Sequence, residues 1–307
     1  MEYKNAIGIA QNLHWFFDET ERSLLDQMAE AGLETVQIIA TAESLRYMTL
    51  ENAEKLLKMT DGKIRITAFW CGWRGPNVWN FTEGPKTLGL VPVEYRKERL
   101  EDLKNGAEFA RALGVADMAT HVGFVPEQPC DPNYQGVVDA VKEIADYCGE
   151  RGLHFNFETG QETPVTLMRL FSDVGAENLG VNLDPANLIL YGRGNPIDAL
   201  DIYGDKIRGV HVKDGDYPKG DFHQLGNERV VGEGSVNFPV FLPKLLKNGY
   251  KGDLYIEREI TGAERADDVK KTIGYIKNII FFHYVYKMNA IIKEGKQYLH
   301  HSKFDMQ

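Results

Sequence analysis

One pattern recurs along the whole chain: a short run rich in β-branched residues, then a stretch with helical spacing of apolar residues, then a turn. Most of these runs do not alternate strictly between apolar and polar residues. That is expected for parallel strands whose outer face is covered by helices. We predict eight strands, at Ala6–Ala10, Thr35–Ala40, Ile64–Trp70, Asp117–Val122, His154–Glu158, Gly180–Asp184, Ile207–Lys213 and Asp253–Glu257.

Between the runs, the helical pattern often stops at a glycine. The stretch Glu98–Leu113 repeats leucine and alanine along one face, and Gly114 follows it directly. Glycine readily takes the left-handed conformation that ends a helix, so this arrangement supports the helical interpretation. The clearest predicted helices are Ser23–Ala31, Glu98–Leu113, Val137–Cys148, Val240–Leu246 and Val269–Ile280.

Eight strand–helix units favour a closed barrel over an open doubly wound sheet. An open sheet usually has fewer strands and often shows GxGxxG after the first one, and the sequence contains no GxGxxG, P-loop or GxSxG. We expect an α/β fold, a single-domain (β/α)8 TIM barrel over residues 1–285. Residues 286–307 would form a C-terminal extension, either a helix or a flexible tail. The long segment Gly72–Val93 is typical of functional or lid-like loops.

The charge balance disfavours some classes of partner. The chain has 35 Lys and Arg against 45 Asp and Glu, a net charge of −10, and this field repels nucleic acids and anionic membranes. The longest apolar stretch, Ile279–Tyr286, is too short to span a bilayer. The N-terminus lacks the apolar core of a signal peptide, and the three cysteines form no CxxC pair, so we expect a cytoplasmic protein.

Four consecutive predicted strands carry a metal-binding side chain at or near their carboxyl ends. These residues are Glu158, Asp184, His211 and Glu257. In a (β/α)8 barrel the carboxyl ends of all strands open onto one face, where the chemistry takes place. The four side chains are therefore expected to meet there.

Three carboxylates in one place repel each other, and a divalent cation relieves that repulsion. Oxygen ligands with one imidazole suit Mn²⁺, our first choice, and also Mg²⁺, Co²⁺ or Zn²⁺. The absence of thiolates argues against a structural zinc site. Each residue taken singly also has an ordinary explanation: a helix cap, a turn residue, a core histidine or a surface ion pair.

The second half of the chain resembles a known family. The stretches that carry the resemblance are NFETGQETP, GVNLDPANLILYG, IRGVHVKD, VVGEGSVNF and LYIEREI, between Phe155 and Ile260. They resemble the sugar phosphate isomerase/epimerase superfamily of xylose isomerase-like TIM barrels, which includes ketose 3-epimerases, inosose dehydratases and hydroxypyruvate isomerases. The resemblance implies that Glu158, Asp184, His211 and Glu257 bind one divalent metal ion. It also implies that Glu158 and Glu257 are the catalytic acid and base on opposite faces of the substrate.

One position departs from that family pattern. The epimerases carry a histidine three residues after the aspartate, where this chain has Asn187. An asparagine can hydrogen-bond a hydroxyl group but does not titrate near neutrality. The predicted substrate-binding residues are His121, Asn187, Lys213, Trp70 and Trp15. The alternatives are a core position for His121, a solvated loop for Lys213 and packing for the two tryptophans. The segment Gly232–Gly234 has two interpretations: its backbone amides could bind a phosphate, or it could be a tight turn without a ligand.

These inferences together predict a metal-dependent isomerase or epimerase. It would act on a sugar or related polyhydroxy carbonyl compound by proton transfer through an enediolate. The alternatives are a metal-dependent lyase similar to inosose dehydratase and a non-catalytic sugar-binding barrel. The partner would be a small sugar or polyol-derived substrate. The aromatic run Ile279–Tyr286 suggests a homo-oligomer contact, although burial of the last barrel helix explains it as well.

Overall fold

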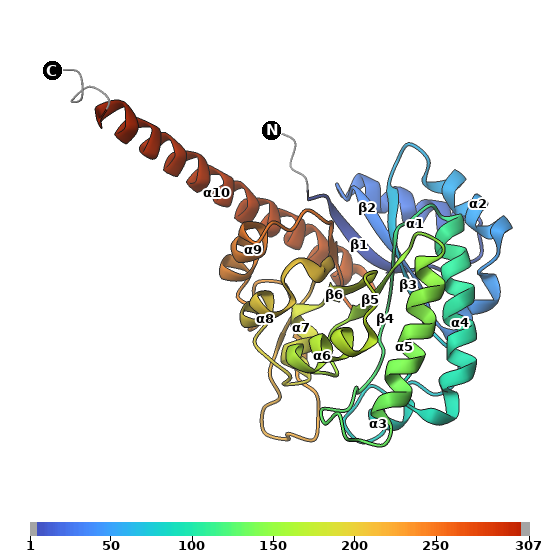
Figure 1. Ribbon diagram of the computed structural model, residues 1–307. Coiled ribbons are helices and arrows are strands. Elements are labelled where there is room, and N and C mark those ends of the chain that lie inside the picture. The colour runs from blue at the N-terminus through green and yellow to red at the C-terminus, as the bar shows by residue number, and fades with distance from the viewer. Residues whose placement is uncertain (1–4, 302–307) are drawn as a thin grey trace.

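The computed structural model describes the backbone of residues 5–301 and the side chains of residues 5–286. Eight parallel strands close into a barrel in the order β1-β2-β3-β4-β5-β6-β7-β10 (Figure 1), which confirms the predicted fold. The barrel strands are β1 (Ile7–Asn12), β2 (Thr35–Ala40), β3 (Arg65–Cys71), β4 (Asp117–Thr120), β5 (His154–Glu158), β6 (Leu179–Leu183), β7 (Ile207–Val212) and β10 (Leu254–Ile256).

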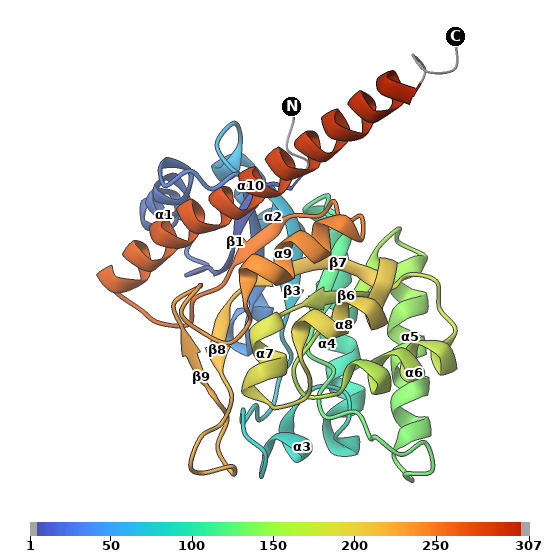
Figure 2. The same cartoon turned by 90° about the vertical axis from the view of Figure 1, so that its left-hand side faces the viewer.

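Helices surround the barrel, as Figure 2 shows from a second side. Their apolar faces join the strands in one large core. The α-helices are α1 (Glu19–Glu30), α2 (Leu50–Thr60), α3 (Gly84–Thr87), α4 (Val93–Ala112), α5 (Tyr134–Gly149), α6 (Pro164–Val174), α7 (Pro185–Leu190), α8 (Pro196–Tyr203), α9 (Phe238–Lys247) and α10 (Ala263–His301), and the 3-10 helices are η1 (Ala42–Tyr47) and η2 (Gly204–Lys206).

Local capping explains where several helices begin. Helix α1 starts before the predicted Ser23 because the Asp18 side chain accepts hydrogen bonds from the amides of Thr20 and Glu21. Sequence periodicity did not single out α2, α6, α7 or α8. These helices have 11, 11, 6 and 8 residues, and the last two are shorter than the window of about 11 residues in which helical periodicity is read.

A short antiparallel hairpin outside the barrel was not predicted. Its strands are β8 (Asp214–Asp216) and β9 (Asn227–Arg229). The Asp214 carboxylate accepts hydrogen bonds from the amides of Gly232 and Gly234. A Cβ on Gly234 would lie 2.2 Å from Asp214 Oδ1, so only glycine fits. The two amides are already bonded, which favours the tight-turn interpretation over a phosphate site.

The long segment after β3 is fixed to the barrel by a buried arginine. Arg99, on α4, donates hydrogen bonds to the carbonyl groups of Arg74 (3.0 Å), Pro76 (2.8 Å) and Gly89 (2.7 Å). Its guanidinium carbon also lies 4.1 Å from the centroid of the Trp73 ring. The segment is therefore anchored at both its beginning and its end.

Replacing Arg99 with methionine is expected to lower the free energy of unfolding by about 3 kcal/mol, because buried carbonyl groups lose their donors. Urea denaturation followed by circular dichroism measures this. Arg111→Met on the same helix is the control, since Arg111 is exposed and pairs only with Glu108. Equal stability of the two variants would contradict the anchoring role.

The last helix extends well beyond the barrel (Figure 1). Helix α10 runs from Ala263 to His301 without a break at residue 286, where the extension was predicted to begin. Burial against the barrel accounts for Ile280, but Phe281 and Phe282 are 52% and 56% exposed. In the part of the chain that the structure describes, every helix is too short or too polar to cross a membrane.

Candidate metal centre

The structure brings the four predicted ligands together at one end of the barrel. Glu158 ends β5, Asp184 follows β6, His211 lies in β7 and Glu257 follows β10. One ligand atom from each residue lies within 4.8 Å of the others. We call these residues the four-ligand cluster. His211 Nδ1 lies 3.3 Å from Glu158 Oε1, 3.3 Å from Glu257 Oε2 and 3.8 Å from Asp184 Oδ2.

Asp184 has one carboxylate oxygen bonded and the other free to bind an ion. Its Oδ1 accepts the Asn187 amide at 2.9 Å and caps α7. Its Oδ2 is buried and has no hydrogen-bond partner, and its nearest cationic group is Lys213 Nζ at 3.6 Å. A buried carboxylate oxygen without a donor is costly, and a cation would satisfy it.

His211 is held so that Nδ1 faces the carboxylates. Its Nε2 lies 2.7 Å from Gln37 Oε1, which can only accept a hydrogen bond. A proton on Nε2 would satisfy Gln37 Oε1 and, in the neutral ring, would leave Nδ1 with the lone pair that a metal needs. Nδ1 has no hydrogen-bond partner either. The two unbonded atoms, His211 Nδ1 and Asp184 Oδ2, fit a divalent cation.

The carboxylates of the cluster are also stabilised by positive charge. Burial works to raise the pKa of Glu158, but His121 and His211 outweigh it and bring the pKa well below its usual value. Burial has the same tendency at Glu257, and Lys213 with His211 lowers that pKa to about 2. Burial itself lowers the pKa of His211, yet Glu257 and Glu158 raise it well above its usual value. A bound dication would take over the role of this imidazolium.

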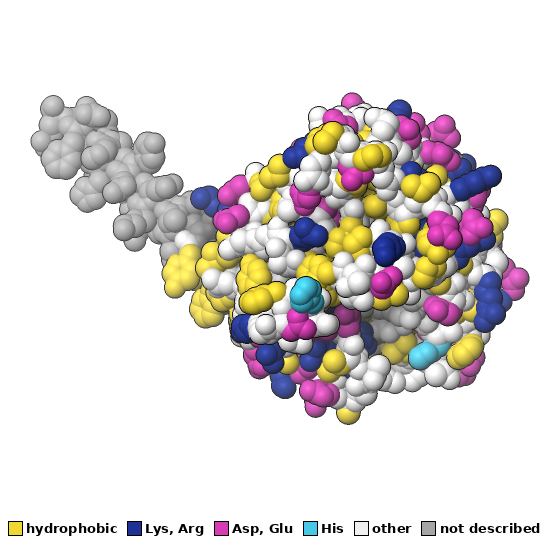
Figure 3. All heavy atoms as spheres, turned by 90° about the horizontal axis from the view of Figure 1, so that it is seen from below, with side chains coloured by type: hydrophobic (Ala, Val, Ile, Leu, Met, Phe, Trp, Pro, Cys, Tyr) yellow, Lys and Arg dark blue, Asp and Glu magenta, His cyan; other side chains and the backbone are white. Residues whose placement is uncertain are grey.

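The cluster lies beside a cavity of about 870 Å³. Figure 3, which looks at the molecule from the side of α3, shows the hollowed face. Glu158 and Glu257 line the cavity, which extends to the start of α10 at Gly262 and Arg265. An aromatic wall consists of Trp70, Trp79 and Tyr191. This volume is ample for a small polyhydroxylated molecule.

The fold is that of a known family. The family model described as a xylose isomerase-like TIM barrel matches residues 25–279. The chain belongs to the xylose isomerase-like TIM barrel family.

Three relatives illustrate this membership. A solved xylose isomerase domain protein from Planctomyces limnophilus has a TM-score of 0.79 and 30% identity, over 90% of this chain and 96% of that one. An uncharacterized protein of Methanocaldococcus jannaschii is 25% identical, over 86% of this chain and 88% of the relative. An inosose dehydratase of Geobacillus kaustophilus is 26% identical, over 53% of this chain and 62% of the relative.

In this family member, three of the predicted substrate-binding residues contact Glu158. Asn187 Nδ2 donates to Glu158 Oε1 at 3.3 Å, His121 Nε2 lies 3.3 Å from the same oxygen, and the Trp70 indole donates to Oε2. Lys213 is buried, with Nζ 3.0 Å from Glu257 Oε2 and 3.6 Å from Asp184 Oδ2. These residues hold the two glutamates in place, and Trp70, His121 and Asn187 also line the cavity.

The structure places Trp15 elsewhere. Its side chain is 3% exposed and belongs to the hydrophobic core. The ring packs against Phe109 of α4, with centroids 5.7 Å apart, and against Phe17. Trp15 is not among the residues that line the cavity. The loop after β1 turns this indole inward. Trp15 therefore packs in the core, whereas it was predicted to stack on a substrate.

Sequence reasoning missed the residues that hold His211. Gln37 comes from β2 on the far side of the barrel interior, and its Nε2 donates to Asn182 Oδ1 at 3.2 Å. Asn182 Nδ2 in turn lies 3.0 Å from His211 Nε2. Polar residues within predicted strands were the available signal, but only closure of the barrel brings them together.

Replacing Gln37 with leucine is expected to weaken metal affinity about 10- to 100-fold, because His211 Nε2 loses a hydrogen-bond partner that holds the ring in place. A Mn²⁺ titration against a competing chelator measures this. Gln135→Leu, on the exposed face of α5, is the control for the exchange of amide for leucine. Unchanged affinity in Gln37→Leu would show that His211 does not need this support.

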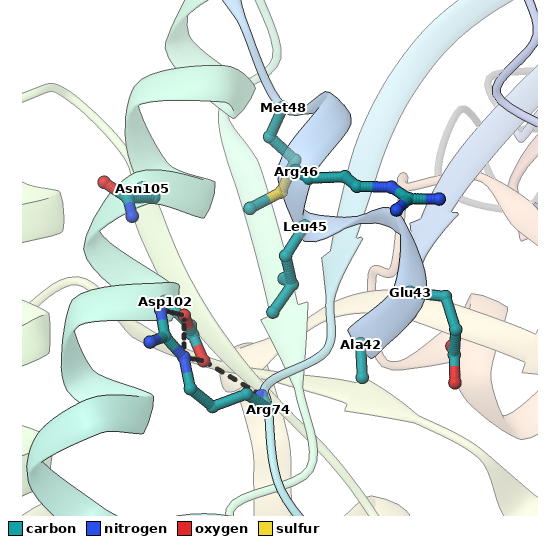
Figure 4. A pocket seen from close by; sticks show the side chains of 8 residues that line it. All are labelled: Ala42, Glu43, Leu45, Arg46, Met48, Arg74, Asp102 and Asn105. Carbon is teal, nitrogen blue, oxygen red and sulfur yellow. Dashed lines mark hydrogen bonds and ion pairs between the residues drawn. The ribbon is translucent and has the colours of Figure 1, made fainter.

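A second hollow, of about 580 Å³, lies between η1 and α4 (Figure 4). Its lining includes Arg74 and Asp102, which are paired, with Arg74 Nε 2.9 Å from Asp102 Oδ1. Arg46 and Glu43 extend away from that pair in Figure 4. The charged groups here are exposed or already satisfied, so the main cavity is the better candidate for chemistry.

Proposed function

We propose that this chain is a divalent-metal-dependent isomerase or epimerase of a small polyhydroxylated carbonyl compound, with Mn²⁺ as the ion. The four-ligand cluster beside the cavity is the observation that carries the proposal. Along the barrel the relevant strands follow the order β5, β6, β7, β10. Glu158 and Glu257 therefore lie at the two ends of the ligand set, as proton transfer on two faces of a substrate requires.

The side chains around each glutamate suit it for proton transfer. A bound dication would polarise the substrate carbonyl and acidify the neighbouring C–H. Lys213 keeps Glu257 ionised, so this carboxylate can accept a proton at neutral pH. Trp70 and Asn187 orient Glu158 from the other side. One glutamate would remove the proton and the other would return one.

A lyase is the second candidate, and two observations favour it. The inosose dehydratase of Geobacillus kaustophilus is a relative, and Asn187 occupies the position where the epimerases carry a histidine. Loss of water after the same proton abstraction needs a donor for the departing hydroxyl group. His121 and Lys213, both buried beside the glutamates, could supply that proton.

The test is a metal-supplemented screen in deuterium oxide. Protein with MnCl₂ is incubated with D-fructose, D-tagatose, D-xylose and 2-keto-myo-inositol. Proton NMR follows the exchange of carbon-bound hydrogen for deuterium. Deuterium in a recovered or isomeric sugar supports the isomerase class. An ultraviolet-absorbing enone supports the lyase. Binding without exchange or elimination would favour a sugar-binding barrel, and an excess of EDTA should stop every reaction.

Two further parts of the proposal concern the setting of the protein. A cytoplasmic location without nucleic-acid partners fits the net charge of −10. Self-association through α10 fits the exposed Phe281, Phe282 and Tyr286. Sedimentation velocity at micromolar concentration tests the second part, and a single monomeric species would contradict it.

A further inference from the structure

The side-chain amide of Gln161 is buried near the four-ligand cluster and is not part of it. Gln161 lies in the loop after β5, three residues beyond Glu158, and its side chain lines the main cavity. It is 1% exposed, yet neither Oε1 nor Nε2 has a hydrogen-bond partner. A buried polar group without partners is destabilising, so an amide in this position indicates a ligand that bonds to it.

The loop holds Gln161 in place from behind. A Cβ on the preceding Gly160 would lie 3.1 Å from the Cβ of Asn187 and 3.4 Å from the Tyr191 ring. The Thr159 hydroxyl donates to the Asp184 carbonyl at 2.8 Å, which ties the same loop to β6. The backbone that carries Gln161 is therefore held in place.

Tyr191 is a second polar residue that lines the cavity beside Gln161. Burial raises the pKa of Tyr191 to about 12, and the adjacent Gln161 amide works in the opposite direction. Both side chains line the main cavity, and the Tyr191 ring lies against Gly160, the residue before Gln161. The Tyr191 ring is fixed by Phe81 and Phe124, each 5.9 Å away between centroids.

The chemistry of these groups selects a class of ligand. A carboxamide offers both a donor and an acceptor, and so does a phenol. A hydroxyl group matches this pair, whereas a phosphate or carboxylate can only accept. The wall is built for a neutral group.

We propose that Gln161 and Tyr191 form a subsite that binds a hydroxyl group of a neutral polyhydroxylated substrate while its carbonyl end lies at the four-ligand cluster. This rests on the substrate class of the proposed function and adds the residues that select it. Gln161 is a specificity-determining residue here, because a site with an unpaired buried amide rejects analogues that cannot pair with it.

The experiment compares Gln161→Leu with the wild-type protein, both loaded with Mn²⁺. Calorimetry measures binding of D-tagatose and 2-keto-myo-inositol, and the probe that wild type binds more tightly is used for the comparison. The dissociation constant should rise about 10- to 100-fold. The melting temperature without sugar should stay equal or rise, because leucine removes an unsatisfied amide. Gln135→Leu, on the protein surface, should change neither quantity.

Other outcomes would overturn the subsite. One such outcome is a Gln161→Leu variant that binds the sugar as tightly as wild type does. Another is a melting temperature below that of wild type in both Gln161→Leu and Gln161→Met, because the amide would then be structural. Binding of neither neutral sugar by wild type, or tighter binding of D-fructose 6-phosphate than of D-fructose, would contradict the ligand class. Weaker sugar binding in Gln161→Leu, with no deuterium exchange in wild type, would support the subsite and reject only the isomerase function.

Discussion

Replacing Glu257 with glutamine is expected to abolish turnover and leave the fold intact. Glutamine has the same shape as glutamate but cannot accept a proton at neutral pH, and it is a much weaker metal ligand. Loss of one proton-transferring group alone costs about 10²- to 10⁴-fold in rate, and we expect the combined loss to exceed 10³-fold. The measurement is kcat on the sugar that the deuterium screen identifies, with circular dichroism to verify the fold.

Glu259→Gln is a matched comparison for Glu257→Gln. Both glutamates lie 3.0 Å from Lys213 Nζ, but Glu259 is 63% exposed and is outside the four-ligand cluster. Its loss should reduce kcat less than about tenfold, as expected for an exposed ion pair. Near-wild-type turnover in Glu257→Gln would mean that the two-glutamate mechanism is wrong.

Replacing Asp184 with asparagine is expected to weaken metal binding by about 10³-fold or more, beyond the effect of outer-shell changes. Asparagine can keep the α7 cap, because its amide oxygen can accept the Asn187 amide as Oδ1 does now. The atom at the Oδ2 position becomes an NH₂ group, which cannot coordinate a cation. The substitution therefore separates capping from metal binding. Elemental analysis after dialysis against a chelator measures the retained metal.

Thermal unfolding gives a second measurement for Asp184→Asn. Metal at 100 times its dissociation constant stabilises a native protein by about 2.7 kcal/mol, and this gain should vanish in the variant. Without metal, the variant should be at least as stable as wild type, because one buried charge near Glu257 is gone. Asp201→Asn, an exposed residue paired with Lys244, is the control. Metal content equal to wild type would remove Asp184 from the ligand set.

The sequence predicted the barrel and the meeting of the four ligands for one reason. Parallel strands in a barrel all open onto the same face, so a residue's place at the end of a strand is enough to locate it. Glu158 and Asp184 follow buried runs whose ends can be read within two residues. The same reasoning did not require any knowledge of side-chain packing.

Aromatic and amide residues could not be placed in that way. Trp15 follows β1 and Trp70 lies near the end of β3, yet one packs in the core and the other donates to Glu158. Gln37 is far from His211 in the chain, and nothing in its own strand indicates a partner. The segment after β3 reads as a loop, and only the position of Arg99 shows that it is anchored.

The sequence by itself determined the barrel, the face that carries the chemistry and the set of ionisable groups that meet there, because these follow from periodicity and from the ends of strands. Tertiary structure decided which nitrogen of His211 faces the carboxylates, where Trp15 packs and that the Gln161 amide has no partner. Those properties depend on contacts between side chains from distant strands. Such contacts are fixed only when the barrel closes and each buried polar atom either finds a partner or is left to a ligand.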